Sequence, residues 1–220
     1  MIMSNVRDSV KWKKPGFNFI QGINRKGYIA VSILLMVVSM SFATAAVAET
    51  TVGGTISTDT VWDVAGSPYI VTSNITVQGT DGADSITTLT IDPGVDVRFN
   101  QNTKLTVGAS SGDPGALVAQ GTAESPILFT SNQATPASGD WYGIIFQNTS
   151  DDATSILEYC TVDYAGYSSG ALYIYSASPQ ILNCTVDNSK SYGIYGTNSS
   201  PQIANSTISN SYGYCIRIRN

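Results

Sequence analysis

The residue types best suited to contact a ligand recur at a fixed spacing near the end of the chain. Tyr173, Tyr195 and Arg217 follow one another at a constant interval, and each comes directly after an apolar residue. Because the side chains of a strand alternate between its two faces, the apolar neighbours are expected to point inward and this column outward. Two residues further on, a second column holds Tyr175 and Arg219.

Tyrosine and arginine columns of this kind suit a sugar ligand. Aromatic rings stack on the apolar faces of sugar rings, and a guanidinium binds a carboxylate through two parallel hydrogen bonds. The columns therefore predict a surface that contacts glycans, and an acidic glycan would fit it. The alternative is a structural role, because tyrosine favours strands and stacked tyrosines stabilise a sheet surface without any ligand.

Two carboxylates come nearest to a cation site. Asp163 and Asp187 each follow a Thr-Val pair, and aligning the two segments places their Cα atoms about 4.8 Å apart on neighbouring strands. At that distance the charges repel unless Ca²⁺ or the nearby Lys190 compensates them. The alternative is a pair of carboxylates that diverge into water. No other metal or cofactor is expected.

The three cysteines are Cys160, Cys184 and Cys215, an odd number, so at least one thiol is free or pairs between chains. Cys160 and Cys184 align and are expected to point inward, which allows either a buried stack of thiols or a disulfide. The sequence contains no histidine. Its absence excludes Ser–His–Asp catalysis and histidine-bound zinc, and it leaves a cysteine nucleophile without its usual base.

These side chains must be positioned by a repeating structure. Ser178–Ile181 recurs as Ser200–Ile203 at the same interval as the tyrosine column, and the units before them are longer and less regular. Short β-branched clusters alternate with turn residues, and no helical period is present after residue 48. The pattern predicts an all-β fold, a right-handed parallel β-helix with coils of about 22 residues. Asn183 and Asn205 occupy matching turns, where Asn tolerates left-handed backbone angles and can stack as a ladder.

Charge divides the chain into a basic leader and an acidic body. Residues 1–48 hold six basic residues and one acid, whereas residues 49–220 hold five basic residues and fifteen acids. An apolar run ending in Ala46-Val47-Ala48 predicts a signal peptide over 1–48, cleaved after Ala48, and hence a secreted or cell-surface protein. The alternative is an uncleaved anchor, because residues 29–48 are long enough to span a bilayer; membrane contact is expected through this segment alone. An acidic body is not expected to bind nucleic acid.

The body is expected to contain two parts. Residues 49–88 are predicted to form a segment that caps the first coil, and residues 89–220 are predicted to form the coils. By the register of the repeats the chain reaches Asn220 inside a coil. We therefore expect the stack to be open or truncated at that end.

Three motifs carry a resemblance to a known family, namely Leu-Thr-Ile-Asp-Pro-Gly-Val-Asp-Val-Arg-Phe at 89–99, Gly-Thr-Ala-Glu-Ser-Pro-Ile-Leu-Phe-Thr-Ser at 121–131 and Gly-Asp-Trp-Tyr-Gly-Ile-Ile-Phe at 139–146. They resemble exported bacterial right-handed parallel β-helix repeat proteins, whose fold is that of pectate lyases. The Ser-Pro-x-Ile-x-Asn repeats fit the same family. The resemblance implies an extracellular or cell-surface setting but no single activity, because the fold hosts lyases, hydrolases, epimerases and adhesins.

The catalytic motifs of polygalacturonases, which share this fold, are largely missing. Asn148-Thr149-Ser150 lacks the final aspartate of Asn-Thr-Asp, Asp151-Asp152 follows at once instead of one coil later, and no Gly-His-Gly is present. Arg217-Ile218-Arg219 matches the Arg-Ile-Lys motif loosely. A lyase would need a base that removes the sugar C5 proton, yet Arg98 and Lys104 are isolated in the sequence. No catalytic residue is therefore assigned, and Asp151-Asp152 is interpreted as a solvated loop.

These observations predict an exported, non-catalytic β-helix module that contacts glycans through its outward tyrosine and arginine columns. One alternative is a polysaccharide-active enzyme, either a pectate-lyase-like lyase or a glycoside hydrolase, with an incomplete or unrecognised active site. A second alternative is a structural or adhesive spacer, which would bind no small ligand.

Overall fold

The computed structural model describes residues 49–109 and 112–220. The signal peptide predicted over 1–48 lies outside the described residues. The described residues form eighteen β-strands and one 3₁₀ helix of three residues, η1 (Val64–Gly66). No helix in this part of the chain is long and apolar enough to cross a membrane.

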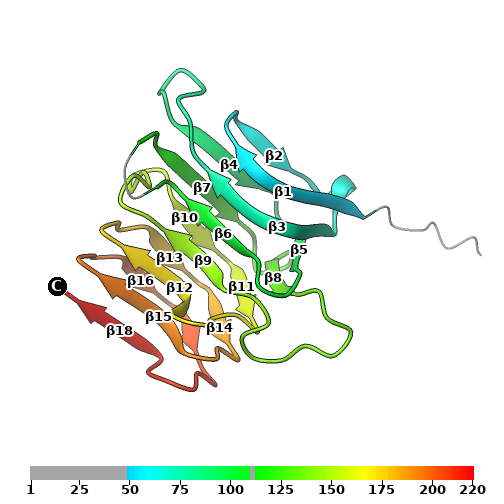
Figure 1. Ribbon diagram of the computed structural model, residues 1–220, viewed down its shortest axis with the longest axis vertical. Coiled ribbons are helices and arrows are strands. Elements are labelled where there is room, and N and C mark those ends of the chain that lie inside the picture. Colours follow the sequence, from blue (N-terminus) through cyan, green and yellow to red (C-terminus); the bar gives the residue numbers. More distant parts are fainter. Residues whose placement is uncertain (1–48, 110–111) are drawn as a thin grey trace, which may run out of the picture. The chain divides into compact units, whose positions relative to one another are not determined.

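The strands form three parallel ladders, which stack from the cyan strands to the red strand β18 in Figure 1. Ladder I holds β5 (Asp96–Phe99), β8 (Ile127–Ser131), β11 (Cys160–Asp163), β14 (Thr185–Asp187) and β17 (Thr207–Ile208). Ladder II holds β6 (Lys104–Val107), β9 (Gly143–Phe146), β12 (Gly170–Tyr175), β15 (Tyr192–Thr197) and β18 (Ile216–Arg219). Ladder III holds β2 (Thr60–Trp62), β4 (Thr87–Ile91), β7 (Gly115–Gln120), β10 (Ile156–Glu158), β13 (Gln180–Leu182) and β16 (Gln202–Ala204).

One passage through ladders III, I and II makes one coil, as in the succession β4, β5 and β6, so the fold is a parallel β-helix. Near the end of the chain, Leu172, Ile194 and Ile216 are successive register partners, which is the spacing that the repeats predicted. Earlier coils are longer: Leu105 of β6 pairs with Ile144 of β9. The predicted fold class and the longer early units are both confirmed.

The inward side chains of the ladders form one apolar core. Trp141, just before β9, is fully buried and stacks on Phe99 of β5 with 3.9 Å between ring centroids and 7° between ring planes. Its indole N–H donates a hydrogen bond of 2.9 Å to the carbonyl oxygen of Asp163, so no polar atom of this ring is left unpaired. Burying a side chain the size of Phe stabilises the fold by roughly 1.5–3 kcal/mol. Trp141 therefore anchors the end of the loop that precedes it.

Left-handed residues mark the corners between ladders. Asn183 and Asn205 lie between ladders III and I with φ of 54° and 52°, and Asn188 and Asn210 lie between ladders I and II with φ of 49° and 47°. Asn adopts this region more readily than most residues because its short side chain forms local hydrogen bonds. The left-handed turns predicted at Asn183 and Asn205 are confirmed.

The two ends of the stack are built differently. Residues 49–88, expected as a cap, contain β1 (Thr50–Ile56), β2, β3 (Tyr69–Val77) and the first residues of β4. Strand β3 serves both ladders I and II, and among the described strands β1 pairs with β3 alone. At the other end, Ile216 and Ile218 of β18 are 43% and 38% exposed, although their register partners on β15 are buried.

Candidate functional site

The outer face of ladder II carries the residues predicted to point outward. Tyr173 of β12, Tyr195 of β15 and Arg217 of β18 are successive register partners. Their inward neighbours Leu172 and Ile194 are fully buried, as strand alternation requires. The predicted column is therefore present in the fold.

Two further tyrosines, which the sequence analysis did not single out, join this column. Tyr192 lies 5.1 Å from Tyr195 between ring centroids, and Tyr214 stacks on Tyr192 at 6.2 Å with 5° between the ring planes. Tyr173 stacks on Tyr195 at 5.5 Å and 17°. A signal for the missed pair existed, because Tyr192 and Tyr214 are separated by the same interval as Tyr173 and Tyr195. We call Tyr173, Tyr192, Tyr195, Tyr214 and Arg217 the Tyr/Arg face.

Arg217 is held by aromatic side chains rather than by a carboxylate. Its Nη1 donates a hydrogen bond of 2.6 Å to the Tyr192 hydroxyl, and its guanidinium carbon lies 5.4 Å from the Tyr192 ring centroid and 5.8 Å from that of Tyr214. Such contacts hold a guanidinium while leaving most of its N–H donors free. Within residues 49–109 and 112–220, the one ion pair is formed by Arg98 and Asp96. Arg217 thus has no acidic partner in the described chain.

Tyr173 carries no charge that would oppose an anion. Burial raises the pKa of the Tyr173 hydroxyl, and the nearby Tyr195 and Tyr175 raise this pKa further. Tyr173 therefore stays protonated at neutral pH. The face presents hydroxyls and ring surfaces beside one fixed guanidinium.

The second predicted column is also in register, with Tyr175, Thr197 and Arg219 as successive partners. Tyr175 is 36% exposed and Arg219 is exposed. The ring stacking and cation–π contacts found in the described residues do not include Tyr175 or Arg219. These two residues lie beside the Tyr/Arg face without being fixed by its contacts.

Lys190 forms a second contact between a cation and a ring. Its Nζ lies 4.2 Å from the ring centroid of Tyr167, and Tyr142 meets Tyr167 edge-on at 5.2 Å. In the described chain, Lys190 forms no ion pair with Asp163 or Asp187. The compensation that we considered for this lysine is therefore absent.

Asp163 and Asp187 are register partners on β11 and β14, as the aligned segments predicted. The Asn188 amide bridges them, because its Nδ2 donates to Asp163 Oδ1 at 2.9 Å and to Asp187 Oδ2 at 3.2 Å. Asn210 Nδ2 and the Ser209 hydroxyl also donate to Asp187 Oδ1, at 2.9 and 2.8 Å. Amide and hydroxyl donors thus offset the repulsion. The described residues hold no group of three or more Cys, Asp or Glu side chains placed to bind a metal ion.

Burial raises the pKa of the Asp163 carboxyl above its usual value of 3.8, and the negative charge of Asp187 adds to the rise. Hydrogen bonds from Asn188 and from the Tyr164 backbone N–H act in the opposite direction and offset part of it. Because the pKa is raised, the folded protein favours the protonated form of the Asp163 carboxyl more than the unfolded chain does.

The three cysteines are free thiols, with Cys160 and Cys184 buried and Cys215 exposed. Cys160 Sγ lies 3.3 Å from the carbonyl oxygens of Ala119 and Glu158, and Cys184 Sγ makes equivalent contacts one coil later. Ser206 continues the pattern on the next coil with its hydroxyl. Burial raises the pKa of the Cys160 thiol. Of the two arrangements considered, the structure contains the buried thiol stack.

Asp151 and Asp152 each accept a hydrogen bond from a backbone N–H. Asp151 Oδ1 accepts a hydrogen bond of 2.8 Å from the Thr154 N–H, and Asp152 Oδ1 accepts one from the Ser178 N–H at 2.5 Å. Hydrogen bonds of this kind stabilise turns between strands. Asp151 therefore acts as a local turn acceptor, whereas Asp152 accepts from a backbone N–H that lies 26 residues further along the chain.

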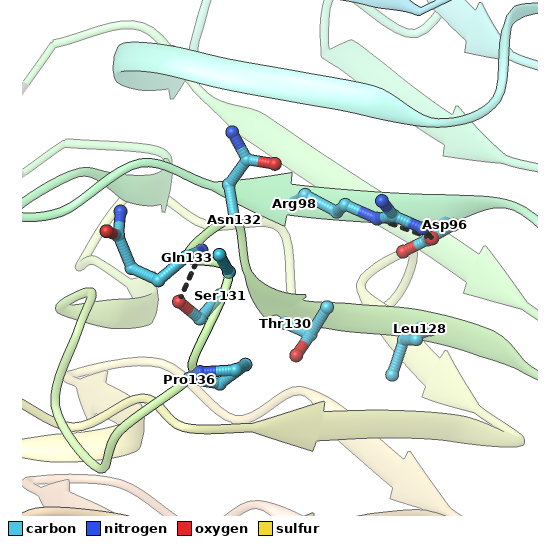
Figure 2. A pocket seen from close by; sticks show the side chains of 9 residues that line it. Asp96, Arg98, Leu128, Thr130, Ser131, Asn132, Gln133 and Pro136 are labelled. Atoms are coloured by element: carbon cyan, nitrogen blue, oxygen red, sulfur yellow. Dashed lines mark hydrogen bonds and ion pairs between the residues drawn. The ribbon is translucent and has the colours of Figure 1, made fainter.

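A cavity of about 420 Å³ opens on the outer face of ladder I, and we call it the Arg98 pocket. Figure 2 shows Asp96 and Arg98 side by side on β5, Leu128 and Thr130 on the neighbouring β8, and Pro136 on the loop over 132–142. Ser131, Asn132, Gln133 and Ala134 complete its lining. No periodic pattern in the sequence pointed to this pocket, because one side of it is formed by a single long loop.

Comparison with known proteins agrees with the architecture. The model of the family described as "Pectate-lyase like beta helix domain" matches residues 54–166, just over half of the chain. No curated protein and no solved structure matches the chain significantly. The chain belongs to the pectate-lyase-like β-helix domain family, which confirms the resemblance seen in its motifs. It is a β-helix module of a family named after a polysaccharide-cleaving enzyme.

Proposed function

We propose that this chain is a secreted or cell-surface β-helix module that binds glycans through the Tyr/Arg face without cleaving them. One observation carries the proposal: Arg217 is fixed against Tyr192 and Tyr214 but has no carboxylate partner in the described chain. A guanidinium that is already oriented loses little conformational entropy when it meets a carboxylate. The stacked rings beside it offer flat apolar surfaces for sugar rings.

The charge distribution supports an acidic glycan as the ligand. Residues 49–220 contain five basic residues and fifteen acids, so most of this part of the chain repels anions. Three of the five basic residues, Lys190, Arg217 and Arg219, lie in the final two coils. This local excess makes the Tyr/Arg face and its surroundings the region that best attracts an anionic sugar. The same overall acidity argues against nucleic acid as a partner.

The non-catalytic part of the proposal rests on the partners of the candidate catalytic groups. Arg98 is paired with Asp96, Asp163 and Asp187 are bridged by Asn188, and each of the Asp151 and Asp152 carboxylates accepts from a backbone N–H. A general acid or base must instead reach the substrate through a polar atom that can take up or give a proton. In the described chain, none of the hydrogen bonds or ion pairs of these groups involves a residue of the Tyr/Arg face.

The setting outside the cell rests on the leader. The basic start, apolar run and Ala46-Val47-Ala48 end of residues 1–48 favour export with cleavage after Ala48. If the leader stays attached, it would supply the protein's contact with the membrane. Intact-mass measurement of the exported protein distinguishes the two forms, because cleavage removes residues 1–48 from the mass.

The function is tested with immobilised polygalacturonate as the probe. The proposal predicts that wild-type protein is retained, that Tyr195→Ala and Arg217→Ala are not, and that no product appears. A polysaccharide lyase would instead release unsaturated uronates that absorb in the ultraviolet, and a hydrolase would release reducing ends. Wild-type protein that is neither retained nor active would indicate a structural spacer.

A further inference from the structure

The Arg98 pocket has no part in the proposed function, because it lies on ladder I whereas the Tyr/Arg face lies on ladder II. Its wall is formed before any ligand arrives. Asp140 Oδ2 accepts hydrogen bonds from the Ser131 hydroxyl at 2.6 Å and from the Ala137 N–H at 2.9 Å, and Asn132 Nδ2 donates to Asn100 Oδ1 at 2.8 Å. A braced wall reduces the ordering that binding would otherwise require.

The charged groups of the pocket neutralise each other. Arg98 Nε donates a hydrogen bond of 2.8 Å to Asp96 Oδ2, and Arg98 Nη2 lies 2.6 Å from the same oxygen in an ion pair. Nη1 and the second Nη2 hydrogen remain as donors, and the Arg98 side chain is 42% exposed. The other carboxylate oxygen, Asp96 Oδ1, is covered and has no hydrogen-bond partner. The ion pair therefore offers an entering ligand the free Arg98 donors and, on the carboxylate, Asp96 Oδ2.

We propose that the Arg98 pocket binds one neutral pyranose residue, at a site separate from the Tyr/Arg face. A compensated ion pair offers donors and an acceptor but no net charge, so it favours an uncharged ligand that both donates and accepts. Sugar hydroxyls do both. Because the two opposite charges are adjacent, their fields largely cancel and the pair gives an anion or a cation little net attraction.

The remaining lining fits the two faces of a sugar ring. Leu128, Ala134 and Pro136 provide apolar surface for the C–H groups, and the Thr130 and Gln133 side chains provide further polar atoms. The volume of about 420 Å³ lies within the range of small-ligand pockets, which is roughly 300–1,000 Å³. In Figure 2 the ion pair lies above the Thr130 and Leu128 side chains, and Gln133 and Pro136 lie to their left.

The test measures binding of three neutral probes, cellotetraose, mannotetraose and β-1,4-galactotetraose, to the full chain by isothermal titration calorimetry. Ala134→Trp fills the pocket from an exposed loop position and leaves the core untouched. Arg98→Met removes the donors but keeps the length of the side chain. Lys104→Met is the matched control for the loss of a cation, and Arg217→Met reports on the Tyr/Arg face.

The proposal expects that wild-type protein binds at least one probe, that Ala134→Trp and Arg98→Met weaken this binding at least about tenfold, and that Lys104→Met and Arg217→Met leave it unchanged. Absence of binding to wild type at millimolar probe overturns it. Binding that survives Ala134→Trp, or that Arg217→Met abolishes, also overturns it. If Arg98→Met fails to fold, Ala134→Trp alone decides, provided that its urea midpoint equals that of wild type. Failure here leaves the polygalacturonate test untouched, because that test depends on the Tyr/Arg face.

Discussion

Arg217 and Tyr192 are joined by a hydrogen bond of 2.6 Å from the guanidinium Nη1 to the phenol oxygen. Tyr192 begins β15 and Arg217 belongs to β18, so the bond connects two successive coils on the outer face of ladder II. The same guanidinium lies over the Tyr192 and Tyr214 rings. A cation fixed by rings rather than by an acid keeps its attraction for an external carboxylate, and this relationship underlies the proposed function.

The left-handed turn at Asn183 predicts a difference between two small substitutions. Asn183→Ala should lower the free energy of unfolding by about 1 kcal/mol, because a Cβ without a hydrogen-bonding group disfavours this backbone region. Asn183→Gly should change that free energy by less than about 0.5 kcal/mol, because glycine adopts positive φ freely. Urea unfolding followed by tyrosine and tryptophan fluorescence measures both. Equal midpoints for the Ala and Gly variants would contradict the turn geometry.

The thiol stack predicts the reactivity of the three cysteines. Cys215 is exposed and should react quickly with a maleimide, whereas Cys160 and Cys184 are buried and should react only after unfolding. Mass spectrometry of the labelled protein should show one added group under native conditions and three in urea without a reductant. One added group in urea, rising to three after reduction, would instead demonstrate a disulfide between Cys160 and Cys184.

The raised pKa of Asp163 predicts how stability depends on pH. Above its unfolded pKa the folded state binds more protons at this site than the unfolded state does, so the free energy of unfolding should fall as pH rises from about 4 through the folded pKa. Asp163→Asn keeps an oxygen that can accept from the Asn188 amide and the Tyr164 N–H, but it removes the charge of this partly buried side chain. The variant should be at least as stable as wild type at pH 7 and should lose this part of the pH dependence. A variant less stable than wild type at pH 7 would show that the carboxylate itself stabilises the fold.

The bridging Asn188 amide predicts the response to calcium. Because amide and hydroxyl donors already occupy Asp163 Oδ1 and both Asp187 oxygens, adding millimolar Ca²⁺ should leave the Tm unchanged. Differential scanning calorimetry with Ca²⁺ and with a chelator measures this. A rise in Tm that Asp187→Ala removes would establish a cation site at this pair.

The sequence predicts the fold and one part of the candidate site because the late coils contain no insertions. Between β12 and β18 every column of ladder II repeats at one constant interval, so Tyr173, Tyr195 and Arg217 can be aligned from the sequence alone. Strand alternation then predicts their direction. Tyr192 was not predicted to join this face. It is the first residue of β15, where strand alternation does not yet determine which way a side chain points.

Features that depend on longer or irregular segments could not be predicted. The loop over 132–142 occurs once, so nothing in the sequence shows that it forms the wall of the Arg98 pocket. The hydrogen bonds from Asn188 to Asp163 and Asp187 depend on the rotamer of the Asn188 side chain, which the sequence does not determine. Trp141 stacks on Phe99 in the early part of the chain, where the coils are longer than the late repeats. The spacing of the late repeats therefore could not align these two residues. Periodicity predicts which residues align, while contacts across corners and loops require coordinates.

The affinity for tetragalacturonate tests the central claim most directly. Full-length wild type, Arg217→Met and the matched control Arg219→Met would be titrated with tetragalacturonate and with its methyl ester. Losing a hydrogen-bonded charge contact should weaken binding of the acid by Arg217→Met about ten- to a hundredfold. Arg219→Met should have a much smaller effect, and the methyl ester should bind wild type and Arg217→Met alike. Equal affinity of wild type and Arg217→Met for the acid, or no binding by wild type, would contradict a glycan-binding Tyr/Arg face.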